Sequence, residues 1–368
     1  MYKDEALSSF QRAFTLLAIL LTLSVLIAGR PASAQMTDAL TISDRQVEPG
    51  TRLDLRLEIV GGEGEPDTFI PVTVLHGNKE GPVLAAVAGV HGFEFASILA
   101  ADRLADRIDP KDLSGTLILV RVANIPSFEW RTPHLNPIDR KNLNRSFPGD
   151  PHGTSTERIA NILSREVVAR ADFLLDLHSG DAGEFLEPFL GVYGGPLSTD
   201  FDLALEVAKG FGFPNIVRYS MNTQEQIDTG RSLNRQGVAA GIPTVLVEIG
   251  QNGSRKEEHA EAVATGVENA LGILDIWNKP RKNVPPPLRL FESTTAVRAT
   301  HSGLFFPVDL ERRYVFEGDF IGTIRDYTGK EVQRLYSPID GYALYGKRGP
   351  SMREGDPVMT IGIPTNAF

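Results

Sequence analysis

The apolar segments of this chain of 368 residues alternate between strand-like and helix-like spacing. Their order limits the folds that the chain can adopt. From about residue 68 to residue 278, short apolar runs typical of strands alternate with segments whose apolar residues recur at helical spacing. GPVLAAVAGV, for example, is apolar enough for a strand buried on both faces, and the helical segment EFASILAADRLADRI follows it. Strands separated by helices predict an α/β fold, in which a mostly parallel or mixed sheet carries helices on both faces.

The pattern changes near residue 285. Three consecutive prolines at residues 285–287 predict a stiff, extended connection. Beyond them the helical spacing ends, and short strand-like runs separated by Gly, Pro and Asp turns continue to residue 368. We therefore expect a large α/β domain at residues 35–284 and a small all-β domain at residues 285–368.

The N-terminal residues have the pattern of an export signal. Residues 13–28 form an uncharged apolar run of 16 residues, and the small residues Ala32 and Ala34 follow at the spacing of a signal-peptidase site. We expect residues 1–34 to be a signal peptide, so that the mature chain is periplasmic or secreted and leaves the membrane after cleavage. An uncleaved membrane anchor is the alternative, although the run is short for a membrane span.

Composition excludes several classes of function. The formal net charge is −10, and no basic run offers a surface for nucleic acid, so we expect no nucleic-acid partner. The chain has no cysteine, which excludes disulfides, thiol nucleophiles and thiolate metal sites. Any metal ion must therefore be held by His, Asp and Glu.

Three ionisable residues stand at the ends of predicted strands. His91 follows PVLAAVAGV, His178 ends FLLDLH and Glu248 ends TVLVE. Ligands of open α/β sheets bind outside the carboxyl ends of the strands, so we expect these side chains to lie at one site. Glu94 follows His91 by three residues and can face the same ion. Two imidazoles and one carboxylate form the ligand set of a catalytic zinc ion, with a fourth position open to water.

Each of these residues also has a purely structural explanation. The H-x-x-E spacing arises often by chance, His178 can be a hydrogen-bonded core histidine, and Glu248 can pair with an arginine. The polar segment NPIDRKNLNRSFPGD, residues 136–150, adds an independent signal. The planar fork of Arg145 suits a carboxylate, and Asn144 offers an amide donor beside it. A loop held together by its own side chains is the alternative for this segment.

Four motifs in sequence order resemble the succinylglutamate desuccinylase/aspartoacylase family of the zinc carboxypeptidase clan. GVHGFE is similar to the family's G-x-H-G-x-E, NLNRSFPG to its N-L-N-R-x-F-P-G, DLHSG to its D-x-H-S/T-G and VLVEIG to its strand-end glutamate. The resemblance extends from about residue 70 to the end of the chain. It implies a zinc carboxypeptidase-like catalytic domain and a C-terminal domain similar to a lipoyl-type sandwich, without a lysine placed to carry a lipoyl or biotin group.

The resemblance also implies a role for individual residues. The residues implied to hold Zn²⁺ are His91, Glu94 and His178. The residues implied to bind the substrate carboxylate are Asn144 and Arg145, and the implied general base is Glu248. The arginine that polarises the scissile carbonyl in the family would be Arg131, with Arg140 as the alternative.

These observations predict an exported zinc-dependent amide hydrolase. Its substrate would be a small N-acyl amino acid or a peptide-like amide with a free carboxylate. Glu248 would take a proton from water and pass it to the departing amine, and Asp176, on the same strand face as His178, could orient that imidazole. Two alternatives stay open, a metallocarboxypeptidase that trims periplasmic peptides and a binding protein that keeps the ion without turnover.

Overall fold

The computed structural model describes residues 38–308 and 314–365, which belong to one compact unit. The expected signal peptide at residues 1–34 lies outside the described residues. Within the described part of the chain, no helix combines the length and the apolar character needed to cross a membrane.

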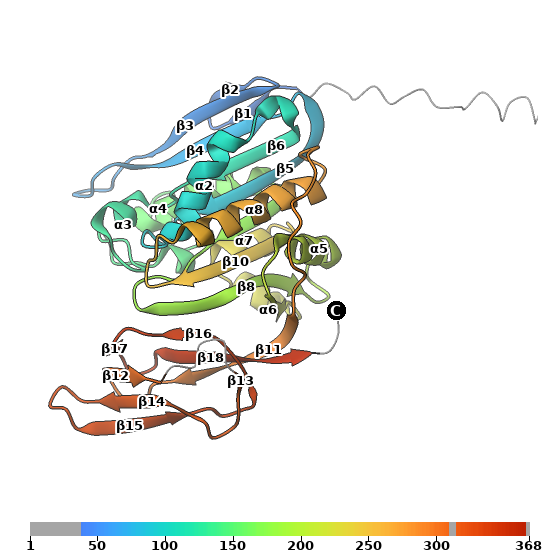
Figure 1. The fold of residues 1–368 in the computed structure, drawn as a ribbon. Coiled ribbons are helices and arrows are strands. Elements are labelled where there is room, and N and C mark those ends of the chain that lie inside the picture. The colour runs from blue at the N-terminus through green and yellow to red at the C-terminus, as the bar shows by residue number, and fades with distance from the viewer. Residues whose placement is uncertain (1–37, 309–313, 366–368) are drawn as a thin grey trace, which may run out of the picture. The chain divides into compact units, whose positions relative to one another are not determined.

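A mixed sheet of twelve strands runs through the described residues in the order β13-β16-β18-β11-β9-β8-β10-β7-β5-β6-β4-β3 (Figure 1). Its strands are β3 (Thr51–Ile59), β4 (Thr68–His76), β5 (Lys79–Ala88), β6 (Ser114–Val120), β7 (Phe173–Leu177), β8 (Glu184–Gly194), β9 (Asn215–Ser220), β10 (Thr244–Gln251), β11 (Arg289–Arg298), β13 (Tyr314–Val315), β16 (Gly341–Lys347) and β18 (Pro357–Thr365). A separate hairpin pairs β1 (Leu40–Ile42) with β2 (Arg45–Val47).

The direction of the strands follows from the connections between them. The central strands β6, β5, β7 and β10 are parallel, as predicted for strands joined through helices. In contrast, β8 follows β7 after a short loop without a helix, and it runs antiparallel to β10. The edge strand β3 and its neighbour β4 are also antiparallel to each other. The α/β fold is therefore confirmed, but the sheet is mixed rather than mostly parallel.

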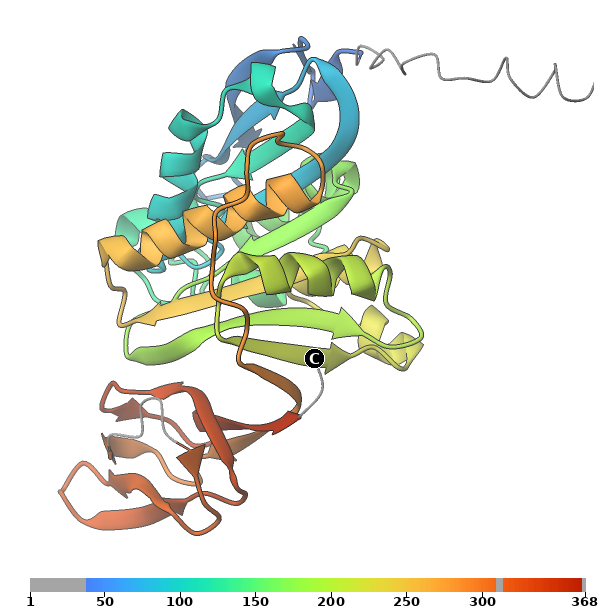
Figure 2. The ribbon, with the colours of Figure 1, turned by 45° about the vertical axis from the view of Figure 1, so that its right-hand side comes forward.

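Helices cover both faces of the central strands (Figures 1 and 2). One face packs against α2 (Phe95–Arg107), α5 (Phe201–Phe211) and α8 (Glu257–Ile273), and the other against α4 (Ser155–Glu166) and α7 (Leu233–Ala239). The remaining helices are short: α3 (Ile125–Trp130), α6 (Gln224–Asp228) and the 3₁₀ turns η1 (Pro110–Asp112), η2 (Leu143–Arg145) and η3 (Val168–Arg170).

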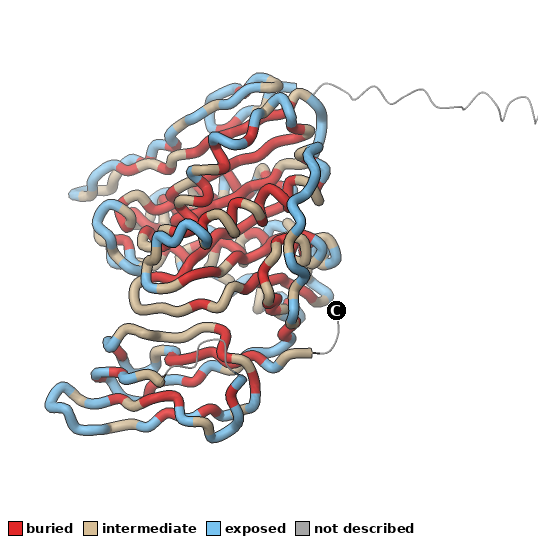
Figure 3. The backbone as a smooth tube through the Cα atoms, in the orientation of Figure 1, coloured by how far each residue is buried: buried red, intermediate tan, exposed pale blue. Residues whose placement is uncertain are grey.

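Successive side chains of β5 point to opposite faces of the sheet, which explains why the sheet has a hydrophobic core on each face. Leu84 and Ala86 face α2 and α8, whereas Ala85 and Val87 point into the opposite core with α4. Successive side chains of a strand point to opposite faces, so an unbroken apolar run serves both layers. Figure 3 shows the result as buried backbone through the central strands. Each large aliphatic side chain buried in this way contributes about 1.5–3 kcal/mol.

The C-terminal residues form strands only, within the described part. Residues 280–288, which include the three prolines, carry no helix or strand. After them, a four-stranded sheet contains β15 (Glu331–Tyr336), β14 (Phe320–Arg325), β12 (Gly303–Pro307) and β17 (Ser351–Met352). The other C-terminal strands extend the main sheet, and β16 also pairs antiparallel with β8. This last pairing brings the C-terminal part to the edge of the candidate site.

Candidate metal centre

His91 and Glu94 lie in the turn between β5 and α2. The turn is tight, because a Cβ atom on Gly92 would lie 2.1 Å from the backbone nitrogen of Phe128. A glycine is therefore required directly after His91. Glu94 occupies the N-cap position of α2, but its side chain makes no capping hydrogen bond. Its carboxylate is instead directed to the two histidines.

The side chains of His91, Glu94 and His178 converge in a buried cluster. Nδ1 of His91 lies 2.7 Å from Oε1 of Glu94, and Nδ1 of His178 lies 2.9 Å from Oε2 of the same carboxylate. One ligand atom from each residue lies within 4.8 Å of the others. The three residues are 8%, 3% and 2% exposed, respectively. The structure thus brings the three candidate ligands together.

The outer nitrogen of each imidazole lies close to a side-chain oxygen. Nε2 of His91 lies 3.1 Å from Oδ1 of Asn142, and Nε2 of His178 lies 2.9 Å from Oδ1 of Asp176. Asp176 is fully buried, and its other oxygen accepts a hydrogen bond of 2.8 Å from Nδ2 of Asn234. Oxygen acceptors at Nε2 favour a proton there and leave the Nδ1 lone pair for a cation. The donor set therefore fits a metal ion.

The charges of the cluster point to the same conclusion. Burial alone would raise the pKa of Glu94, but the two histidines lower that pKa to about 2. Burial opposes a charge on His178, yet Asp176 and Glu94 raise the pKa of this imidazole well above its ordinary value. The carboxylates thus favour positive charge between them, which a divalent cation would supply in place of protons.

Glu248 lies on the neighbouring strand β10, beside this cluster. The register between β10 and β8 shifts between Glu248 and Gly250. Such an irregularity changes the direction in which nearby side chains point. Burial raises the pKa of Glu248 well above the usual range, while the charge of His178 opposes the rise. Within residues 38–308 and 314–365, no arginine forms an ion pair with Glu248, so a structural salt bridge does not account for it.

Comparison with known proteins identifies the family. The model of the succinylglutamate desuccinylase/aspartoacylase catalytic domain matches residues 80–274. An N-alpha-acetyl-L-2,4-diaminobutyric acid deacetylase from Halomonas elongata is 31% identical over 303 residues, which cover 80% of this chain and 85% of that protein. The chain belongs to the succinylglutamate desuccinylase/aspartoacylase family. The resemblance carried by the four motifs is thereby confirmed.

Solved structures of the family share the fold. The product-bound ectoine utilization protein EutE (DoeB) from Ruegeria pomeroyi superimposes with a TM-score of 0.77 at 25% identity, over 89% of this chain and 100% of that one. A succinylglutamate desuccinylase/aspartoacylase from Rhodobacter sphaeroides gives a TM-score of 0.75 at 23% identity, over 90% and 100% of the two chains. The likeness thus includes the C-terminal strands as well as the catalytic domain.

The two residues that the family resemblance assigns to the substrate carboxylate lie in η2. Asn144 is buried, and its Oδ1 accepts a hydrogen bond of 2.9 Å from the backbone nitrogen of Leu233. Arg145 is exposed and lines a cavity of about 420 Å³ together with Asn142 and Arg231. Lys141, Asp150 and Glu157 also line this cavity, which adjoins the candidate ligands because Asn142 contacts His91 as well.

The two arginines considered for the carbonyl lie elsewhere on the same segment. Arg131 and Arg140 are exposed, and neither side chain makes a hydrogen bond or an ion pair within the described residues. His134 is the basic residue of this segment that reaches the ligands, since its ring lies 5.1 Å from that of His91. Burial opposes its charge, but Glu184 and Asp181 raise the pKa of His134.

Two residues of the site were not predicted from the sequence. No sequence pattern distinguishes His134 from an ordinary loop histidine, and Asn142 has no predicted role although it belongs to the NLNRSFPG motif. The available signal was weak in both cases. A lone histidine in a loop is common, and the motif contains two asparagines, of which only Asn144 had been assigned. Their places in the site depend on contacts with His91, which lies more than 40 residues earlier in the sequence.

Proposed function

We propose that the protein is a zinc-dependent amide hydrolase that removes the acyl group from a small N-acyl amino acid. One observation carries the proposal: the Nδ1 atoms of two histidines converge on one buried carboxylate, and Glu248 stands beside them on the neighbouring strand β10. The deacetylase from Halomonas elongata, with which the chain shares 31% identity, supports the deacylase assignment.

His91, Glu94 and His178 would hold the ion. Zinc fits a donor set of two imidazoles and one carboxylate with an open position, and when bound it supplies a Lewis acid that activates water at neutral pH and polarises an amide carbonyl. Asp176 and Asn142 keep the two imidazoles in the orientation that presents Nδ1.

Glu248 supplies the proton transfer. Burial raises the pKa of this carboxyl well above that of an ordinary glutamate, which suits a group that must both accept and donate a proton. It takes the proton of the attacking water and delivers it to the nitrogen of the leaving amine. A glutamine at this position would keep the shape but could not carry the proton.

Arg145 selects the substrate. Its guanidinium group and that of Arg231 line the cavity that adjoins His91, and no carboxylate of the described residues forms an ion pair with either. A planar guanidinium binds a carboxylate through two parallel hydrogen bonds. We therefore propose that the free carboxylate of the amino-acid part binds here. Asn144 supports Arg145 from the buried side of the turn, through its hydrogen bond to Leu233.

The proposal includes export and the division of the chain. Residues 1–34 would direct the protein to the periplasm, residues 35–284 would form the zinc carboxypeptidase-like catalytic domain, and residues 285–368 would form the appended β-domain. The apolar run and the A-x-A spacing support the first part, and the extended connection at residues 280–288 supports the boundary.

A substrate screen tests the proposed function. The zinc-loaded protein should release amine from N-acyl amino acids, among which N-acetyl-2,4-diaminobutyrate, N-acetylaspartate and N-succinylglutamate are the first to compare. Short peptides with a free C-terminus belong in the same screen, because cleavage of their last bond alone would favour a metallocarboxypeptidase. Release of amine from none of these compounds would exclude both enzymes and favour a binding protein.

A further inference from the structure

The loop between β7 and β8 connects the metal ligands to the C-terminal strands. At its beginning, the backbone nitrogen of Ser179 donates a hydrogen bond of 3.2 Å to Oε2 of Glu94. At its end, the carbonyl oxygen of Gly183 accepts hydrogen bonds from the backbone nitrogens of Arg348 and Gly349, at 2.7 and 3.1 Å. The loop is therefore fixed both by a metal ligand and by the C-terminal part of the chain.

A row of ionic side chains follows the same route. Nζ of Lys347 lies 2.8 Å from Oε1 of Glu184, and the same oxygen lies 3.5 Å from Nε2 of His134. On the other side of the ring, Nδ1 of His134 lies 3.3 Å from Oδ2 of Asp181, which also accepts a hydrogen bond of 3.0 Å from the His134 backbone nitrogen. His134 is thus held between two carboxylates.

The row ends at a metal ligand. The ring of His134 meets that of His91 edge to face, with an interplanar angle of 88°. A displacement of His134 would therefore be transmitted to His91 by direct contact. Packed side chains have few alternative positions, so such a contact fixes the ring of the ligand.

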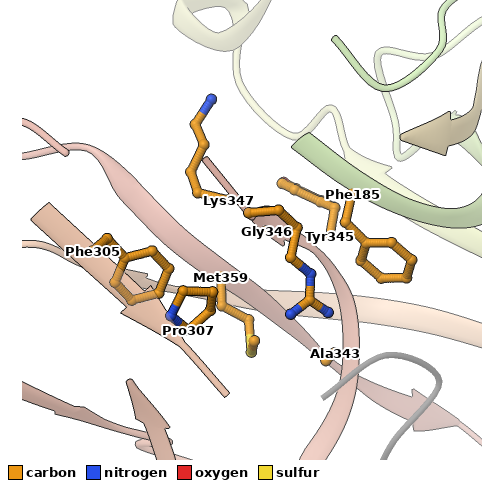
Figure 4. A pocket seen from close by; sticks show the side chains of 9 residues that line it. Phe185, Phe305, Pro307, Ala343, Tyr345, Gly346, Lys347 and Met359 are labelled. Atoms are coloured by element: carbon orange, nitrogen blue, oxygen red, sulfur yellow. The ribbon is translucent and has the colours of Figure 1, made fainter. Parts of the chain in front are cut away.

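Lys347 is placed by backbone pairing. It lies opposite Glu184 in the ladder between β16 and β8, at the last residue of β16. In Figure 4 its side chain extends away from the apolar groups of Phe305, Pro307 and Met359. The side chain of Lys347 is 23% exposed and that of Glu184 is 24% exposed. Because both are mostly buried, water and salt screen this ion pair less than one at the surface.

We propose that Lys347 is a positioning residue for the metal centre, which it reaches through Glu184 and His134. The proposal deepens the proposed function and rests on it. The C-terminal strands then contribute to the reaction as well as to the stability of the fold. One of their side chains sets the orientation of His91 and of the loop that contacts Glu94. Without the ammonium group, His134 is the only remaining ionic partner of Glu184 within the described residues. Glu184 then has no ionic contact with the C-terminal strands.

Kinetics of matched variants test this role. In Lys347→Met, kcat should fall roughly 10- to 100-fold, the usual cost of losing support around a metal ligand, with KM changed less. Lys347→Arg should restore most of the loss, because it keeps the charge. Lys330→Met removes an exposed lysine of the turn between β14 and β15 that has no ion pair in the described residues, and this variant should match the wild type.

A double-mutant cycle tests the route. If Lys347 acts through His134, the variant carrying both Lys347→Met and His134→Asn should be no slower than the slower single variant, within about twofold. Independent losses that multiply would overturn the proposal. So would a Lys347→Met enzyme with wild-type kcat, or one that shows only a lower melting temperature.

Hydrogen exchange separates this proposal from the proposed function, because it requires no substrate. Amides of residues 179–186 in the zinc-loaded protein should exchange faster in Lys347→Met than in Lys330→Met. If the wild type hydrolyses no N-acyl amino acid but this difference appears, the function is wrong and the positioning stands. If the wild type is active and the loop exchanges equally in both variants, the positioning is wrong.

Discussion

Oδ1 of Asp176 lies 2.9 Å from Nε2 of His178, and both side chains are almost fully buried. The pair fixes which nitrogen of the ring faces Glu94. Asp176 lies on β7, and His178 directly follows the strand two residues later, so the extended backbone delivers the carboxylate and the imidazole to the same face.

Asp176→Asn should weaken zinc binding. An amide can turn its NH₂ group toward Nε2, and it lacks the charge that stabilises the correct tautomer, so we expect affinity for zinc to fall by roughly 10- to 100-fold. Competition with a chromogenic chelator measures the change. The exposed residue Asp202, in the first turn of α5, provides a control as Asp202→Asn. If both variants bind zinc with the same affinity, Asp176 does not support the metal site.

Arg145→Met should act on substrate recognition. A charge-assisted contact with a carboxylate contributes about 1.5–3 kcal/mol, so kcat/KM should fall by tens-fold or more while zinc remains bound. The control is a substrate whose carboxylate is amidated, on which the variant and the wild type should differ little. An equal loss on both substrates would show that Arg145 does not bind the carboxylate.

Glu248→Gln should abolish proton transfer without unfolding the protein. We expect the variant to keep its zinc and its melting temperature, while kcat falls by about 10²- to 10⁴-fold, the usual contribution of a positioned acid or base. Both quantities can be measured on one preparation. A large drop in melting temperature with kcat nearly intact would assign Glu248 a structural role instead.

The mature protein should begin at or near Gln35. Cleavage after Ala34 follows from the apolar run of residues 13–28 and the A-x-A spacing. N-terminal sequencing of the exported form gives the answer directly. Full-length protein retained in the membrane would favour the uncleaved anchor.

Local sequence patterns were sufficient for the central part of the fold. The apolar runs that became β5, β7 and β10 end where His91, His178 and Glu248 stand, and parallel strands bring such ends to the same edge of a sheet. The four motifs then assigned the family. These predictions succeeded because each depends on a strand and the few residues that follow it.

The rest depends on contacts between distant segments. The pairing of β16 with β8 joins Lys347 to Glu184, 163 residues apart, and no local pattern encodes such a pair. The antiparallel course of β8 follows from a loop too short to hold a helix, which apolar spacing alone does not reveal. His134 reaches the site only because its loop folds over His91.

Zinc content and turnover, measured together on the wild type and on His178→Ala, test the central claim most directly. The wild type should bind roughly one zinc ion per chain, lose N-acyl amino acid hydrolysis when a chelator removes the metal, and regain it when zinc is restored. His178→Ala should lose most of the metal and the activity. Full zinc occupancy in His178→Ala, or undiminished hydrolysis by the metal-free wild type, would contradict the account.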